Sequence, residues 1–158
     1  MEYYKDAYIT IRDSELHDIC LMKDNLRQDD INEIWASSHF LPEACLLHGY
    51  LFSSIKMTIL KGGEPIAMFG VVPYEKAACV WLLGTSGIDD VKKSFMKASR
   101  PMVDLMLGDF DFIYNYVDDR YKRAIKWIEW CGAKFNEPLP YGEEKLPFRY
   151  FEIRRKYV

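Results

Sequence analysis

The sequence lacks the paired metal or redox ligands that identify several protein classes at once. Its four cysteines form no Cys-x-x-Cys pair, and no two of its three histidines stand four residues apart. These absences exclude a zinc knuckle, a redox dithiol and a helical histidine metal site. We therefore expect no metal, and we expect reduced, mostly buried thiols at Cys20, Cys45, Cys79 and Cys131.

A long apolar run is absent as well. No segment approaches the roughly 20 consecutive apolar residues that cross a bilayer. The first ten residues, MEYYKDAYIT, have no basic stretch followed by an apolar one, as a cleaved signal would. We therefore expect a soluble protein with no membrane span and no cleaved signal.

The chain has no excess of positive charge. Its formal net charge is -3, which disfavours nucleic-acid binding as the main function because that binding depends on phosphate neutralisation. Basic residues gather only near the C-terminus, at Arg149, Arg154, Arg155 and Lys156. Side chains alternate between the two faces of a strand, so we expect this segment to be a solvated edge and not a nucleic-acid site.

The composition is that of an ordered globular protein. Of the 158 residues, 49% are hydrophobic and 15% aromatic, and a chain of this length buries roughly two thirds of its unfolded surface. There is no internal repeat, linker or low-complexity segment. We expect a single domain over residues 1–158, ordered except in the first six or so residues.

Apolar periodicity and turn residues predict the order of the elements. The expected strands are residues 8–14, 54–60, 65–72, 77–83, 112–117, 134–135 and 148–155. The expected helices are two between residues 15 and 39 with a break near Gln28–Asp29, one at 43–52, one at 88–108 with a kink or break at Pro101, and one between 117 and 134. The first strand ends on Asp13-Ser14, a typical helix cap.

This order predicts an α/β fold with a mixed sheet. The strand, helix and strand between residues 77 and 117 require a right-handed crossover, which makes those two strands parallel. The three strands between residues 54 and 83 are joined by short turns and form an antiparallel meander. We expect about six or seven strands flanked by four or five helices.

Within NYVDDRYKRAIKWIEWCGAKF, residues 115–135, four residues match a known pattern: Val117, Ala124, Ile125 and Gly132. With the element order of nearly the whole chain, this segment resembles the GNAT superfamily of acyl-CoA-dependent N-acyltransferases. The resemblance implies a GNAT-like domain, acetyl-CoA as the cofactor and an amine as the acceptor.

Four segments, PIAMFGVVP, WLLGT, residues 114–135 and PYGEEKLPFRYFEIR, also look like phage-encoded GNAT-like proteins. These include the internal virion proteins of short-tailed coliphages. This second resemblance implies a role in the virion or its assembly. It also implies other virion or host proteins as partners, in preference to nucleic acid, and a location in the host cytoplasm during infection or inside the virion.

The resemblance places the cofactor loop directly after the strand at 77–83. The candidate cofactor-binding residues are Leu83, Gly84, Thr85, Ser86 and Gly87. In the family pattern R/Q-x-x-G-x-G/A, backbone N–H groups bind the pyrophosphate at a helix start. This chain has neither the leading arginine or glutamine nor the close glycine pair. Asp89 and Asp90 follow, and we expect these carboxylates to cap the helix and to repel a diphosphate.

Three residues are candidates for catalysis. Tyr121 stands where the family has an asparagine, and Ile128 stands where it often has the tyrosine that protonates the leaving thiolate. Isoleucine has no proton to donate, so a nearby hydroxyl such as that of Tyr121 would have to replace it. Asp118 and Glu33 are the candidates for a general base, although acids at a helix start are often only dipole partners.

These departures leave two functions open. One is a phage GNAT-fold protein with a degenerate acetyl-CoA site and little or no transferase activity. The other is an active acetyl-CoA-dependent N-acetyltransferase acting on a protein or a small amine. The loop at 136–148 either covers the substrate groove or docks on a partner. We expect Trp127 to pack in the core and Trp130 to lie at the surface.

Overall fold

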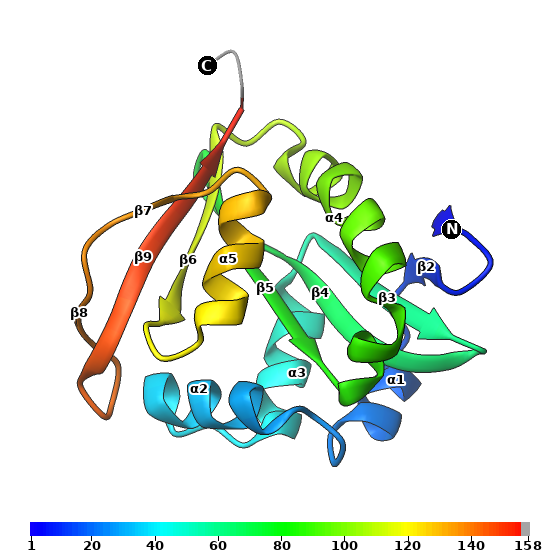
Figure 1. The fold of residues 1–158 in the computed structure, drawn as a ribbon, viewed down its shortest axis with the longest axis horizontal. Coiled ribbons are helices and arrows are strands. Elements are labelled where there is room, and N and C mark those ends of the chain that lie inside the picture. The colour runs from blue at the N-terminus through cyan, green and yellow to red at the C-terminus, as the bar shows by residue number, and fades with distance from the viewer. Residues whose placement is uncertain (156–158) are drawn as a thin grey trace.

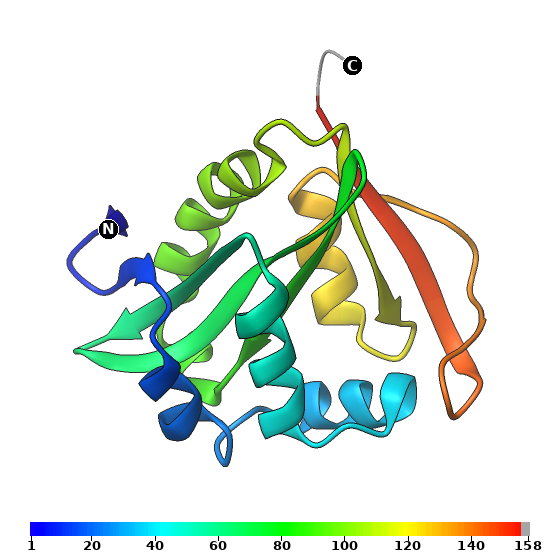
Figure 2. The same ribbon diagram turned by 180° about the vertical axis from the view of Figure 1, so that it is seen from behind.

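One mixed β-sheet runs through the molecule, with helices on both of its faces (Figures 1 and 2). The computed structural model describes residues 1–155. The nine strands are ordered β1-β2-β3-β4-β5-β6-β9-β7, and β8 pairs with β9. In chain order they are β1 (Glu2–Lys5), β2 (Thr10–Asp13), β3 (Ile55–Lys61), β4 (Glu64–Tyr74), β5 (Ala77–Gly84), β6 (Phe112–Asp118), β7 (Lys134–Phe135), β8 (Leu139–Tyr141) and β9 (Leu146–Arg154).

Helices α4 and α5 lie on one face of the sheet, and α1 and α3 lie on the other. Helix α2 lies across the end of the sheet at which β5 and β6 finish (Figure 1). The helices are α1 (Leu16–Met22), α2 (Gln28–Ser38), α3 (Pro42–Phe52), α4 (Lys92–Leu107) and α5 (Lys122–Trp130), and a 3-10 helix, η1 (Ser86–Val91), precedes α4. The predicted α/β class and mixed sheet are confirmed.

The sheet changes from antiparallel to parallel at β5 and β6. Strands β2 to β5 form an antiparallel meander, whereas β6 returns parallel to β5 through α4, as the crossover argument predicts. The two parallel strands pair only between Ala77–Cys79 and Phe112–Tyr114. Beyond this pairing they part, while β9 continues to pair with β6 as far as Asp118. A gap between two central strands is therefore built into the sheet.

The turn between β8 and β9 holds the C-terminal end of α2. The backbone N–H groups of Glu143 and Glu144 donate to the carbonyls of Ser37 and Ala36, at 3.2 and 3.1 Å. These carbonyls have no partner within the helix, so the turn supplies the hydrogen bonds that the helix end needs. The segment predicted as a loop at 136–148 thus contains β8 and the start of β9, and it docks on the chain's own α2.

A buried ion pair fixes α1 to the antiparallel half of the sheet. The Asp18 carboxylate, which is almost fully buried, accepts two hydrogen bonds of 2.9 Å from the Arg12 guanidinium and one of 2.7 Å from the Thr58 hydroxyl. It also accepts the N–H of Glu15, which caps α1 in place of the predicted Asp13-Ser14. Desolvation opposes the charge, but these donors prevail and hold the pKa of Asp18 below its usual value.

Other sequence-based predictions need correction at their boundaries. The first residues are ordered, because β1 pairs with β2, and β1 and β8 bring the sheet to nine strands. The first two helices are separated by residues 23–27, before Gln28 and not at it. Helix α4 continues through Pro101 without a break. Of the four cysteines, all free, only Cys131 is buried.

Gly142→Ala is expected to destabilise the fold by about 2 to 4 kcal/mol. Gly142 has a positive φ of 75°, and a Cβ there would lie 2.6 Å from the Cα of Ser37. Gly63→Ala is the matched control, since Gly63 has φ of 80° but no atom within 4 Å of its Cβ position. In the control, the free energy of unfolding should fall by only about 1 to 2 kcal/mol, which is the cost of placing alanine in a left-handed backbone conformation. Urea unfolding measures both, and equal losses would show that the turn does not clamp α2.

Candidate functional site

At the gap between β5 and β6, the facing edges of the two strands have no β-strand partner within residues 1–155. At its closed end the Asn115 side-chain amide donates to the carbonyl of Val80, which joins the two strands one step beyond their last backbone pairing. Farther along, the N–H of Gly84 points into the gap, where a side chain accepts it. Strand alternation places the backbone groups of Leu82 on this same edge. An extended ligand can pair with such an edge.

Two carboxylates of α2 close the open end of the gap. Asp30 accepts the backbone N–H of Gly84 at 2.8 Å, and Glu33 accepts the backbone N–H of Asp118 at 3.1 Å. The acids stand three residues apart, which puts them on one face of the helix. Helix α2 therefore bonds to the ends of both parted strands, β5 through Asp30 and β6 through Glu33.

Burial makes Glu33 an unusual acid. Desolvation is the main cause that raises its pKa from 4.5 to about 7, and the neighbouring charges of Asp30 and Asp118 add to the effect. The Asp118 N–H and the Arg27 guanidinium act in the opposite direction. Glu33 is thus both protonated and ionised in comparable amounts near neutral pH, which suits a group that exchanges protons.

Asp30 is kept near an arginine. Burial raises the pKa of Asp30, and its pairing with Arg27 at 3.0 to 3.2 Å and the N–H of Gly84 offset part of that rise. The Arg27 N–H in turn donates to the Gly84 carbonyl at 2.9 Å. Both polar groups of Gly84 are therefore held by the start of α2.

Asp118 and Tyr121 complete the cluster from the other side of the gap. Asp118 is fully buried and binds the Arg120 guanidinium at 2.7 and 3.0 Å. The Tyr121 hydroxyl is buried and has no hydrogen-bond partner among the described residues. Burial raises the pKa of Tyr121, the Arg120 charge lowers it, and the charges of Asp118 and Glu33 raise it further. The structure thus brings together the three predicted catalytic candidates, Tyr121, Asp118 and Glu33.

The predicted cofactor loop is compact. The Thr85 hydroxyl accepts the N–H of Gly87 at 3.1 Å, and its carbonyl accepts the N–H of Ile88 at 3.3 Å. Leu83 points into the core with α1 and α3, whereas Ser86 is exposed. Two of the N–H groups at this helix start are therefore already bonded within the loop.

The two aspartates after the loop are paired with cations from other elements. Asp89 accepts a hydrogen bond of 3.0 Å from Arg123, at the start of α5, and Asp90 accepts one of 2.8 Å from Lys61, at the end of β3. All four side chains are exposed to solvent. We expected these carboxylates to repel a diphosphate, but that expectation did not take Arg123 and Lys61 into account. The positive charges of these two residues balance the negative charges of Asp89 and Asp90.

Aromatic contacts join α5 to α4. The Trp127 ring lies 5.1 Å from that of Phe95, and its indole N–H donates to the Ser99 hydroxyl at 3.0 Å. Trp130 is partly exposed and is covered on one side by the Arg100 guanidinium, 4.0 Å from its ring centroid. The predictions for Trp127 and Trp130 are confirmed.

The basic C-terminal residues bond within the chain. Arg149 binds Asp119, Arg154 binds Glu152, and the Arg155 guanidinium donates to the carbonyl of Gly108. Lys156 lies outside the described residues. Over residues 1–155 no group of His, Cys, Asp and Glu side chains is arranged to hold a metal ion. In that same part of the chain no helix has the length and apolar character of a membrane span.

Several members of the site are not among the candidate residues chosen from the sequence. Asp30 carried a detectable signal, because it stands three residues before Glu33 on one helix face. Arg120 follows Asp118 by two residues, so the ion pair between them could have been predicted from the sequence. Asn115 and Arg123 gave no local signal, since their partners lie 35 and 34 residues away.

Solved structures with the same architecture include acetyltransferases. An acetyltransferase of the GNAT family from Bacillus anthracis gives a TM-score of 0.71 at 12% identity, covering 98% of both chains. Ard1 from Thermoplasma volcanium gives 0.71 at 16% identity, covering 94% of this chain and 98% of that one. Spermidine N-acetyltransferase from Vibrio cholerae, in complex with CoA and spermine, gives 0.69 at 13% identity, covering 94% and 96%. The chain has the GNAT acetyltransferase fold.

At these identities the similarity extends to the fold, and neither a family model nor a curated protein matches the sequence. Within this GNAT fold, the parted strands are β5 and β6, and the predicted cofactor loop leads into η1. The predicted catalytic residues come from α2, the last residue of β6 and the β6–α5 connection.

Glu33→Gln is expected to stabilise the protein at about pH 8 and to leave its stability nearly unchanged at about pH 4. The folded-state pKa of Glu33 lies above its ordinary value, so the folded chain binds the proton more tightly and loses stability as pH rises from 4.5 through about 7. Glutamine keeps an oxygen for the Asp118 N–H and carries no charge. Thermal unfolding followed by circular dichroism across this range measures the difference.

The matched control for this prediction is Glu129→Gln, which removes an exposed carboxylate of α5. It should shift the melting temperature little at any pH. A Glu33→Gln effect of the same size at every pH would mean that the substitution acts through packing and not through ionisation.

Proposed function

We propose that this GNAT-fold chain is an acetyl-CoA-dependent N-acetyltransferase in which Glu33 is the general base toward an amine. One observation carries the proposal. A carboxyl group whose pKa is raised to about 7 lies at the open end of the gap between β5 and β6, in one cluster with a buried tyrosine hydroxyl that has no hydrogen-bond partner within residues 1–155. Perturbed acids clustered in a gap are typical of reaction centres.

Glu33 and Tyr121 have complementary roles in this proposal. An amine is protonated in neutral water and attacks only after it loses a proton, and an ionised Glu33 is the acceptor for that proton. Its raised pKa makes it a strong enough base while leaving part of it ionised near pH 7. Tyr121, whose pKa is raised, keeps its proton and is the donor to the leaving thiolate in place of Ile128. Asp118 and Arg120 hold the β6–α5 connection that carries Tyr121.

The chain also offers groups that fit acetyl-CoA, which would supply an activated acetyl thioester. The edge of β5 at Leu82 suits the amides of the pantetheine arm, and the exposed cations Arg123 and Lys61 suit the phosphates. These cations are held by Asp89 and Asp90. Exposed ion pairs contribute only about 0 to 1 kcal/mol, so exchange of a carboxylate for a phosphate costs little.

A second function is favoured by the cofactor loop. The N–H groups of Gly87 and Ile88 are bonded to Thr85 and are not free for a pyrophosphate. Combined with Ile128 at the position of the family acid, this supports a degenerate GNAT site. The chain would then serve as a phage-type internal virion or assembly protein that binds other virion or host proteins, with little or no transferase activity.

Isothermal titration with acetyl-CoA, paired with an assay of free thiol release on a panel of amines, tests the proposal. We expect saturable acetyl-CoA binding and amine-dependent release of CoA. Glu33→Gln should lower kcat by about 100-fold or more, because it removes the base, while leaving the affinity for acetyl-CoA unchanged. Tyr121→Phe should lower kcat as well, and Glu129→Gln, which removes an exposed carboxylate of α5, is the control that should change neither quantity.

An absence of binding heat at millimolar acetyl-CoA would rule out the transferase and favour the second function. That function makes its own prediction: the protein should be present at a fixed copy number in purified virions. Quantitative mass spectrometry of the particles measures this number.

A further inference from the structure

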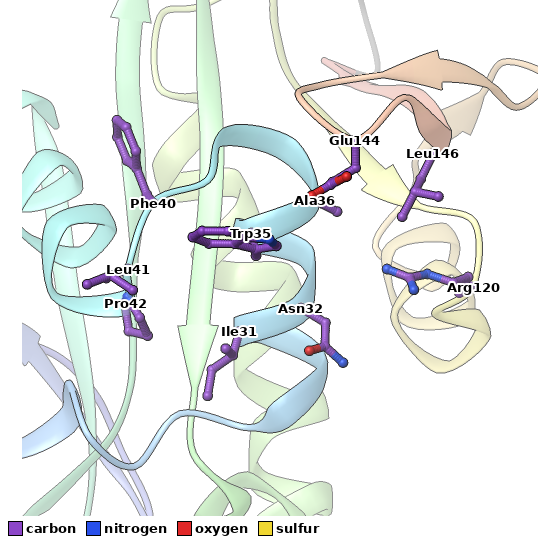
Figure 3. Close-up of a pocket in the computed structure, with 10 residues that line it drawn as sticks. All are labelled: Ile31, Asn32, Trp35, Ala36, Phe40, Leu41, Pro42, Arg120, Glu144 and Leu146. Atoms are coloured by element: carbon purple, nitrogen blue, oxygen red, sulfur yellow. The ribbon is translucent and has the colours of Figure 1, made fainter.

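A cavity away from the proposed reaction site lies where α4, α5 and β9 end, and we call it the helix-end cavity. Its volume is about 410 Å³, which is in the range of small-molecule sites. The three ends meet at the edge of the molecule opposite α2 (Figure 1). A cavity of about 460 Å³ lies along α2 (Figure 3) and is lined by Arg120, which binds Asp118. That second cavity borders the site described above, whereas the helix-end cavity is separate from it.

The floor of the helix-end cavity is apolar. Four of its lining side chains are buried in the main core: Val103, Leu107, Cys131 and Ile153. Apart from Arg155, the other lining residues are exposed: Asp104, Gly108, Gly132 and Arg154. A ligand in this cavity therefore rests an aliphatic group on the floor and meets charged side chains above it.

Two arginines at the end of β9 bring hydrogen-bond donors to the cavity. The Nε of Arg155 is buried and has no hydrogen-bond partner within residues 1–155, whereas its Nη2 donates to the carbonyl of Gly108. Arg154 uses Nε and Nη2 for Glu152, and no described residue accepts from its Nη1. Because a buried donor needs an acceptor, this side of the cavity suits an anionic acceptor such as a carboxylate.

The end of α4 has the opposite preference. Asp104 lies in the last turn of α4, where the helix dipole disfavours a carboxylate, and neither α4 nor α5 has a basic residue in its last turn. Over residues 1–155 Asp104 forms no ion pair. The carboxylate and the negative ends of two helices therefore attract a cation to this side of the cavity.

We propose that the helix-end cavity binds a free α-amino acid with an aliphatic side chain. The ammonium group lies against Asp104, the carboxylate against Arg154 and Arg155, and the side chain on the apolar floor. Opposite charges that line one cavity without pairing with each other are complementary to a zwitterion. A ligand with a single charge would satisfy only one side. The site does not depend on the proposed acetyltransferase activity, and binding alone tests it.

Leucine, leucinamide and isocaproate are the probes, because they share a side chain and differ in charge. Leucinamide lacks the carboxylate, and isocaproate lacks the ammonium group. At about pH 6 the amines are protonated and the carboxylates are ionised. In a titration followed by NMR, we expect saturable shifts of the Gly108 and Gly132 amide signals. Leucine should bind about tenfold or more tightly than either analogue.

Substitutions on the two sides of the cavity should separate the two charges. Asp104→Asn should reduce the affinity for leucine to that for isocaproate without weakening isocaproate, because it removes only the partner of the ammonium group. Arg155→Lys keeps the charge but loses the Nε–H, so it should weaken leucine and isocaproate and leave leucinamide unchanged. Asp24→Asn, at an exposed position between α1 and α2, is the matched control and should change no affinity.

Circular dichroism of each variant checks that it is folded. The absence of saturable leucine binding to the wild type overturns the proposal. Analogues that bind as tightly as leucine overturn it as well, and so do shifts confined to residues outside the cavity. A folded Asp104→Asn variant that binds leucine as the wild type does would also contradict it.

Discussion

The separation of β5 from β6 is the constraint on which the rest of the molecule depends. Parted strands leave backbone N–H and C=O groups that must find other partners, since unpaired buried polar groups are costly. Helix α2 provides partners for two of these groups, because Asp30 accepts the N–H of Gly84 and Glu33 accepts the N–H of Asp118. The same helix is held at its other end by the turn between β8 and β9. Segments from the beginning and the end of the chain are thus fixed around one opening.

Several acids lie close together at the gap between β5 and β6, and the repulsion between their charges determines how readily each of them binds a proton. Asp30 and Glu33 lie close together, and Asp118 lies just across the gap. Arginines offset only part of this charge, with Arg27 beside Asp30 and Arg120 beside Asp118. Glu33 has no arginine bonded to it in the described residues, and it is the acid whose pKa rises to about 7. The least compensated carboxyl is therefore the one best suited to exchange a proton.

Local pattern was sufficient to predict the strands and hairpins of the meander and the helix in residues 115–135. It failed for β1 and β8, which are short and become strands only by pairing with β2 and β9. It also placed the start of α4 too early, because apolar spacing does not distinguish a 3-10 turn from the first turn of an α-helix. Residue chemistry singled out Glu33 and Asp118, but the sequence did not show that α2 brings them into contact. The cations that pair with Asp89 and Asp90 lie 34 and 29 residues away along the chain.

The clamp between the β8–β9 turn and α2 has a mechanical consequence. A ligand that enters deeply between β5 and β6 must widen the aperture, and widening displaces the helix that spans it. Because Glu143 and Glu144 are bonded to the last turn of that helix, the displacement has to move the hairpin with it or detach it. The width of the gap between β5 and β6 and the position of the β8–β9 hairpin therefore change together.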